Sequence, residues 1–146
     1  MGLFSKLTKS AKSVAKQNVF EAIVAASVLV AAADGEIEKK ESEKLERMLS
    51  NNDSLSSFKK TEIQRLVAKY SATVETDFRM GKLKMMKEIE DIAENATDAE
   101  EVFVTAIAIA ESDGEIEPKE LEVLTEIGRR LGLNLKDYGI DAAVAV

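Results

Sequence analysis

An eight-residue segment occurs twice in this chain, and this repetition constrains the fold more than any other feature of the sequence. Residues 34–41 read DGEIEKKE and residues 113–120 read DGEIEPKE, so seven of the eight positions are identical at an offset of 79 residues. Each copy follows an alanine-rich apolar stretch and precedes an amphipathic stretch. Repetition of this kind indicates two copies of one supersecondary unit. We therefore expect each copy to consist of a helix, an Asp-Gly loop and a second helix.

The residue composition favours helices throughout the chain. The sequence has 1 Pro, 7 Gly and 5% aromatic residues, whereas β-rich folds need frequent turn residues and aromatic or β-branched runs. A hydrophobic content of 45% in 146 residues is enough for one core. We predict an all-α, single-domain bundle of about seven helices, with two pseudo-symmetric helix-loop-helix halves.

Hydrophobic periodicity and cap residues divide the chain into five segments. They are an amphipathic helix (1–18), repeat unit 1 (19–50), connecting helices (51–96), repeat unit 2 (97–132) and a C-terminal tail (133–146). The helices after the first are expected near residues 19–33, 39–50, 56–75, 77–95, 98–112 and 118–132.

Three signals mark the ends of the helices in the second unit. Thr97 and Glu100 have the spacing of a capping box at a helix start. Pro118 fits the first position of the next helix, and Gly132 fits its C-terminal stop.

The leading helix of each unit is apolar on nearly every face, which is typical of a buried element. We expect these two helices, near 19–33 and 98–112, to pack together at the centre of the bundle. The side chains expected to be inaccessible are Ile23, Val24, Leu29, Ile37, Val104, Ile107 and Ile116.

The start of the chain superficially resembles a signal peptide, because lysines precede an apolar run and three alanines. Glu21 interrupts that run, and its span of residues 19–33 is too short for a confident membrane helix. Residues 102–110 repeat the same apolar pattern inside the chain. We therefore interpret the run as core and expect the mature protein to keep residues 1–33.

Residues 3–17 predict an amphipathic helix that docks on the bundle. Its apolar stripe consists of Leu3, Leu7, Ala11 and Val14, and the lysines lie largely off that stripe. The preferred interpretation is that the stripe covers the bundle while the lysines reach outward. Peripheral binding to an anionic membrane is the alternative.

Charge is distributed unevenly along the chain. The first part carries four lysines without an acidic residue, and the part after residue 20 has 16 basic and 27 acidic residues, a net charge of -11. An acidic body disfavours phosphate backbones, so nucleic acid is not an expected partner. The four lysines are Lys6, Lys9, Lys12 and Lys16.

The chain contains no Cys and no His. This excludes disulfides, thiolate or imidazole metal sites, and Ser-His or Cys-His nucleophile pairs. A metal site would have to use oxygen ligands, which suit hard cations such as calcium, magnesium or manganese.

The Asp-Gly loops allow two interpretations. Read as half of an EF-hand, Asp34, Gly35 and Glu41 take loop positions 5, 6 and 12. The second copy offers the same positions at Asp113, Gly114 and Glu120. The early carboxylates at positions 1 and 3 are missing in both copies, so we expect at most a weak, water-rich cation site.

The other interpretation is structural. Glycine supplies the positive φ of a helix-ending turn, Glu41 and Glu120 cap the following helices, and the loop isoleucines anchor the turns. This accounts less well for Asp34 and Asp113, because a helix C-terminus disfavours an anion unless a cation or a basic partner offsets it.

The sequence also resembles a known family. The segments that carry the resemblance are residues 31–41, their echo at 110–120, and the ending LGLNL (131–135) followed by YGI (138–140). Over essentially the whole chain they are similar to the tellurite-resistance TerB proteins. TerB-like domains also occur attached to other modules, so the resemblance indicates a domain type more firmly than a pathway.

The resemblance implies a helical bundle of two related halves and a cytoplasmic protein of tellurite and general stress resistance, at most peripheral to the inner membrane. It also implies an integral-membrane Ter partner and binding of a divalent cation through acidic residues. The ligands implied in this chain are Asp34, Glu38, Glu41, Asp113, Glu117 and Glu120.

The expected function is therefore a non-catalytic, metal-responsive interaction module. Reduction of tellurite calls for thiols or a redox cofactor, and this chain has no Cys. Two alternatives stay open. One is a protein-binding adaptor with purely structural loops, and the other is a carboxylate-based metal-dependent hydrolase, which requires both loops to converge beside a pocket.

Overall fold

A computed structural model describes residues 17–141, and every regular element in this range is helical. No β-strand is present in the described range, so the predicted all-α fold class is confirmed. The first predicted helix, residues 1–18, lies almost entirely outside the described residues; the other six expected helices correspond to α2 to α7. The elements are α2 (Gln17–Ala31), α3 (Lys39–Ser50), η1 (Asp53–Leu55), α4 (Lys60–Thr76), α5 (Phe78–Asp91), α6 (Ala96–Glu111), α7 (Pro118–Leu131) and η2 (Leu135–Tyr138), where η denotes a 3-10 helix.

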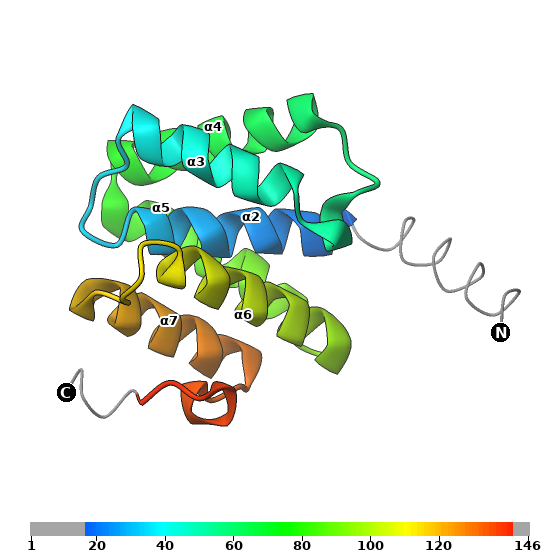
Figure 1. Cartoon of the computed structure of the whole chain (residues 1–146), viewed down its shortest axis with the longest axis vertical. Coiled ribbons are helices and arrows are strands. Elements are labelled where there is room, and N and C mark those ends of the chain that lie inside the picture. Colours follow the sequence, from blue (N-terminus) through cyan, green and yellow to red (C-terminus); the bar gives the residue numbers. More distant parts are fainter. Residues whose placement is uncertain (1–16, 142–146) are drawn as a thin grey trace, which may run out of the picture.

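Helix α2 forms the centre of the bundle. It contacts all five other described α-helices, with α3 and α4 on one side and α6 and α7 on the other (Figure 1). All side chains from Ala22 to Val30 are fully buried. The polar member of this run is Ser27, whose hydroxyl donates a hydrogen bond to the Ile23 carbonyl at 2.8 Å, so its burial leaves no unpaired donor. The apolar run is thus core, as predicted.

No helix in residues 17–141 combines the length and the apolarity that a membrane crossing requires. This agrees with the interpretation of the α2 run as an interior element, since its apolar side chains are covered by protein.

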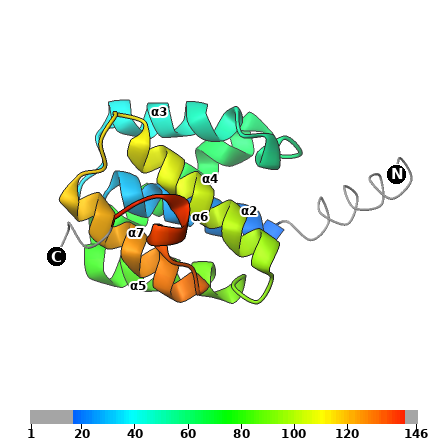
Figure 2. The same ribbon diagram turned by 60° about the horizontal axis from the view of Figure 1, so that its bottom comes forward.

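Helix α6 is buried on one side only. It packs against α2 and α7, and the view in Figure 2 shows it in the front layer with α7. Phe103 and Ile107 face the core, whereas 48% of Val104 is exposed. The prediction that Val104 is inaccessible is therefore wrong, because no element in residues 17–141 covers the outer face of α6.

The other predicted core positions are found in the interior or at its edge. Ile23, Val24 and Leu29 are completely buried, and Ile37 is 9% exposed. Ile116 is half-buried and packs against the same core. Both loops are thus attached to the core by their isoleucines, the first more deeply than the second.

The connecting helices are shorter than predicted, because α4 begins later than expected and α5 ends earlier, at Asp91. Helix α4 begins at Lys60, four residues after the predicted start, since η1 and a turn that ends with the Phe58 N–H bonded to the Leu55 carbonyl occupy the preceding residues. Helix α5 starts where the Asp77 side chain accepts a hydrogen bond from the Met80 N–H.

The start of α6 is capped by a different residue from the one predicted. The Asn95 side chain accepts a hydrogen bond from the Asp98 N–H at 3.0 Å, so Asn95 is the N-cap and the predicted capping box of Thr97 and Glu100 is wrong. An asparagine in this place satisfies a free helical amide as well as a threonine does.

Both signals for α7 are confirmed. Pro118 lies at the first helical position, and Gly132 ends the helix with a φ of 74°. The Leu133 N–H then donates to the Gly128 carbonyl at 2.7 Å, which completes a Schellman motif. The chain continues into η2, where Tyr138 packs edge-on against Phe103.

Candidate functional site

The two Asp-Gly loops have the same backbone geometry. Gly35 and Gly114 have φ values of 95° and 101°, a region that side chains with a Cβ rarely adopt. Their amides close equivalent turns, bonding to the Ala32 carbonyl at 2.8 Å and to the Glu111 carbonyl at 2.9 Å. Glycine is therefore required by the turn in both copies.

The glutamates that follow each loop cap the next helix. The Glu41 carboxylate accepts a hydrogen bond from the Glu38 N–H at 3.1 Å. In the second copy, the Glu120 carboxylate accepts one from the Glu117 N–H at 2.9 Å. The structural interpretation of Glu41 and Glu120 is confirmed by these contacts.

The two loop aspartates differ in their partners. Asp34 accepts a hydrogen bond from the Glu36 N–H within its own loop at 3.1 Å. Asp113 instead forms an ion pair with Lys44 at 2.6 Å. Since Lys44 lies on α3, this ion pair connects α3 to the loop between α6 and α7.

The side chains around this ion pair form a small cleft between α3 and the α6–α7 loop, which we call the paired-loop cleft. Its volume is about 160 Å³. Three of the six predicted ligands line it, namely Glu41, Asp113 and Glu120, whereas Asp34, Glu38 and Glu117 do not. The lining residues are Ala31, Lys40, Glu41, Lys44, Leu45, Met48, Ile109, Ser112, Asp113 and Glu120.

Two lysines of the cleft were not predicted from the sequence. Lys40 and Lys44 are one turn apart on α3, a spacing that places both on the same helix face. Their sequence positions give no signal that this face meets the loop at Asp113. The site is therefore a mixed cluster of carboxylates and ammonium groups.

The surroundings of Glu120 in the cleft raise the pKa of its carboxyl group. Burial is the largest cause that raises its pKa, and the negative charges of Glu117, Asp113 and Glu41 raise it further, against the lowering effect of the hydrogen bond from the Glu117 N–H. Glu41 follows the first Asp-Gly loop and Glu120 follows the second, so carboxylates from the two loops lie close enough for the charge of one to act on the other. Burial and the neighbouring negative charges thus disfavour the ionised form of Glu120.

We expect Glu120→Gln to stabilise the fold near neutral pH by less than about 1 kcal/mol, the usual range for partly exposed charge interactions. Because the pKa of Glu120 is raised in the folded state, ionisation of this group costs stability, and that cost appears as the pH rises above its ordinary value of 4.5. Glutamine keeps an oxygen that can accept the Glu117 N–H. Thermal melts of both proteins between pH 4 and 7 measure the difference.

The stability advantage of the variant should be absent at the acidic end of that range and should grow with pH. A variant that is less stable than the wild type at neutral pH would show that the charge of Glu120 helps the fold.

Comparison with known proteins places this site in a family. The family model described as "Tellurite resistance protein TerB" matches residues 20–141, which include both Asp-Gly loops and the paired-loop cleft. The chain belongs to the TerB family. No curated protein and no solved structure shows significant similarity to it.

TerB membership associates this chain with tellurite resistance and agrees with the helical fold described above. The match extends from the first turn of α2 to three residues beyond η2. The sequence resemblance to TerB proteins is thereby confirmed at the level of the family.

The cation implied for TerB proteins can be tested against the residues of the cleft. Their oxygen atoms suit a hard cation. However, nowhere in residues 17–141 are three or more acidic side chains grouped closely enough to hold a metal ion, and Lys40 and Lys44 share the cleft. The donors therefore fit in chemical type, while their arrangement is not a preformed cage.

Proposed function

We propose that this TerB-family chain is a non-catalytic interaction module of tellurite and stress resistance whose paired-loop cleft responds to a divalent cation. The observation that carries the proposal is the convergence of Glu41, Asp113 and Glu120, from both repeat units, on one cleft. The raised pKa of Glu120 supports it, because a cation in the cleft would offset the repulsion among these carboxylates.

The ion pair between Lys44 and Asp113 is the contact that such a cation would change. Most of the Asp113 side chain is exposed, at 80%, so the pair contributes at most about 1 kcal/mol to stability. Asp113 can therefore exchange Lys44 for a cation at low cost. Loss of the pair would free α3 from the α6–α7 loop and alter the surface that a partner meets.

The partner implied by the family is a protein, with an integral-membrane Ter protein as the leading candidate. The strongly acidic loops support a partner with a basic surface, since complementary charge speeds and orients association. Calcium, magnesium and manganese are the cations to test.

A protein-binding adaptor with purely structural loops is the second candidate function. It is favoured by the observation that Glu41 and Glu120 already cap helices and that Asp113 already has a basic partner. The hydrolase is less well supported. Two-metal hydrolysis needs carboxylates gathered around the cations, and the described part of the chain has no group of three.

The repeat provides a matched pair of variants to separate these functions. Asp113→Asn removes a carboxylate that lines the cleft, and Asp34→Asn makes the same change at the equivalent position outside it. We expect Asp113→Asn to weaken cation binding by about tenfold or more, the effect of about 1.4 kcal/mol, while Asp34→Asn leaves it unchanged. Amide NMR titrations with each cation measure the affinities residue by residue.

The double variant Asp34→Asn/Asp113→Asn tests whether cation binding is needed for tellurite resistance. Under the proposal, cation-induced stabilisation shrinks and cells survive tellurite less well. If the wild type responds to none of the three cations and the double variant protects cells fully, the adaptor function stands and cation binding is rejected.

A further inference from the structure

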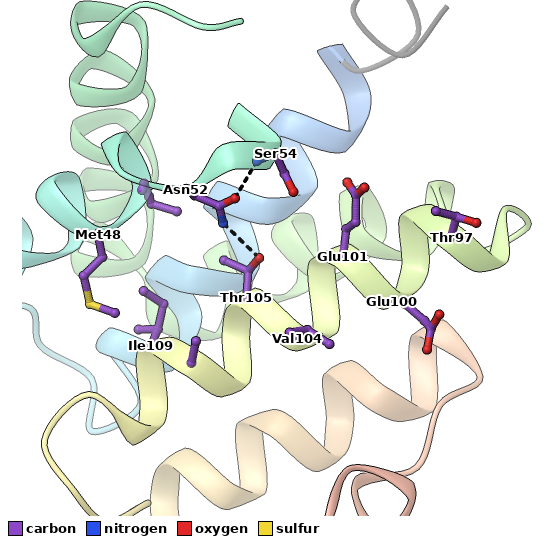
Figure 3. Close-up of a pocket in the computed structure, with 11 residues that line it drawn as sticks. Met48, Asn52, Ser54, Thr97, Glu100, Glu101, Val104, Thr105 and Ile109 are labelled. Carbon is purple, nitrogen blue, oxygen red and sulfur yellow. Dashed lines mark hydrogen bonds between the residues drawn. The ribbon is translucent and has the colours of Figure 1, made fainter. Parts of the chain in front are cut away.

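A second, larger groove lies beside the paired-loop cleft. Its volume is about 470 Å³, and it is bounded by the end of α3, by η1 and by the outer face of α6. Figure 3 shows Met48 and Ile109 at one end of this α6 groove, and Thr97 with Glu100 and Glu101 at the other. The Asn52 side chain joins the two sides of the groove. It donates a hydrogen bond to the Thr105 hydroxyl on α6 at 3.2 Å and accepts one from the Ser54 N–H in η1.

The floor of the α6 groove is apolar and uncovered in residues 17–141. Val104 is 48% exposed, and Ala108, one turn further along α6, is also exposed. Two other large apolar side chains in the described range are similarly exposed, Met80 and Leu83, and both lie on α5. Val104 differs from them because it lies in a walled groove, where a covering side chain would be shielded from water on several sides.

We propose that residues 3–14 of this same chain occupy the α6 groove as an amphipathic helix. Their apolar stripe, Leu3, Leu7, Ala11 and Val14, has the spacing of one helix face. At 1.5 Å per residue, a helix of the 12 residues 3–14 is about 18 Å long, and the 13 residues of α6 from Thr97 to Ile109 span about 20 Å. The segment therefore matches the length of the groove.

The start of α2 is in the right place for this arrangement. Figures 1 and 2 both show the first turn of α2 at the same end of the bundle as the first turn of α6. Two antiparallel helices are commonly joined by two to five residues, and residues 15 and 16 supply such a connection before α2 begins at Gln17. The segment would then run antiparallel to α6.

Charge complementarity supports the same orientation. The antiparallel direction places Lys12 and Lys16 at the end of the groove where Glu100 and Glu101 lie, and Leu3 and Leu7 toward Met48 and Ile109. Two of the four lysines of residues 1–16 thus meet the acidic end of the groove. Lysines on the outer face of the segment stay in water while their stems add apolar cover.

Disulfide trapping tests the proposal in the full chain. The protein has no Cys, so a pair of introduced thiols reacts without competition. We expect Leu7→Cys with Val104→Cys to form an intramolecular disulfide with oxidised glutathione about tenfold faster than Leu7→Cys with Leu83→Cys, because a disulfide requires Cα atoms about 4.4–6.8 Å apart. The control site is matched, since Leu83 is 42% exposed and lies on α5, outside the groove.

Equal rates for the two pairs would overturn the proposal. A crosslink between two molecules, detected by mass spectrometry as a dimer that depends on protein concentration, would also overturn it, because a second copy would then be the occupant.

A substitution outside the described residues gives an independent measurement. Leu7→Asp places a charge on the apolar stripe and leaves every residue of the described bundle unchanged. We expect it to shift the amide resonances of Val104, Thr105 and Ala108 while those of Met80 and Leu83 stay in place. Unchanged groove resonances would overturn the proposal.

Discussion

Replacement of Phe103 by alanine is expected to lower the free energy of unfolding by about 3–5 kcal/mol, the usual cost of emptying a buried phenylalanine site. The Phe103 side chain is completely buried between the helices of the core. Its ring also meets Tyr138 edge-on, with 5.2 Å between the ring centroids. Alanine would leave a cavity and release η2 from one of its contacts with the helical core, so the loss combines both effects.

Urea unfolding followed by circular dichroism measures this change, and Met80→Ala is the control. Met80 lies on α5, outside the α6 groove, and is 51% exposed, so its truncation should cost less than about 1 kcal/mol. Similar losses at both positions would mean that the cost of truncation does not depend on burial.

A methyl group added at Gly128 should destabilise the protein by about 1–3 kcal/mol, the range for overpacking a core. A Cβ at this position would lie 2.8 Å from the Leu133 carbonyl oxygen and 3.0 Å from the Phe103 ring. The backbone of Leu133 has little freedom to withdraw, because its N–H is bonded to the Gly128 carbonyl. The clash should outweigh the helix preference of alanine over glycine, which is about 1 kcal/mol in the opposite direction.

The comparison of Gly128→Ala with Arg129→Ala isolates the packing effect. Arg129 is the next residue on α7 and is exposed, so its truncation should change stability by about 0.5 kcal/mol or less. Thermal melts of both variants suffice. A Gly128→Ala protein that melts at or above the wild-type temperature would show that the α7 end and η2 can shift apart freely.

Local signals in the sequence were sufficient for much of the fold. Pro118 and Gly132 define α7 because each acts through its own backbone geometry. The predicted range 39–50 agrees with α3 for a similar reason, since the Asp-Gly turn and the Glu41 cap lie next to it in the chain. The predicted start of α4 was wrong because η1 and the turn closed by the Phe58 N–H occupy the residues before Lys60.

The exposure of Val104 required information that a single helix does not contain. The α6 sequence is apolar on nearly every face, so its pattern alone indicates full burial. Which face stays uncovered depends on where α3 and η1 come to lie. Periodicity predicts a helix and its hydrophobicity, but the neighbours decide how much of it is covered.

The sequence predicted the local roles of several residues in the candidate site, but it did not predict which side chains come together in the cleft. The turn glycines and the capping glutamates follow from residues close in sequence. The different partners of Asp113 and Asp34 do not follow from nearby residues. Asp113 pairs with Lys44, which lies 69 residues before it in the sequence. Identical loop sequences therefore acquired different surroundings.

The complete burial of α2 also has a consequence for synthesis on the ribosome. Residues 22–30 are covered by helices that include α6 and α7, and these helices are translated well after α2. At about 5–20 residues per second, the roughly 80 residues between equivalent points of α2 and α6 take about 4–16 s to appear. During that interval only α3, α4 and α5 are available to cover the most apolar segment of the chain. The nascent protein therefore depends on partial helix packing or on a chaperone to avoid aggregation.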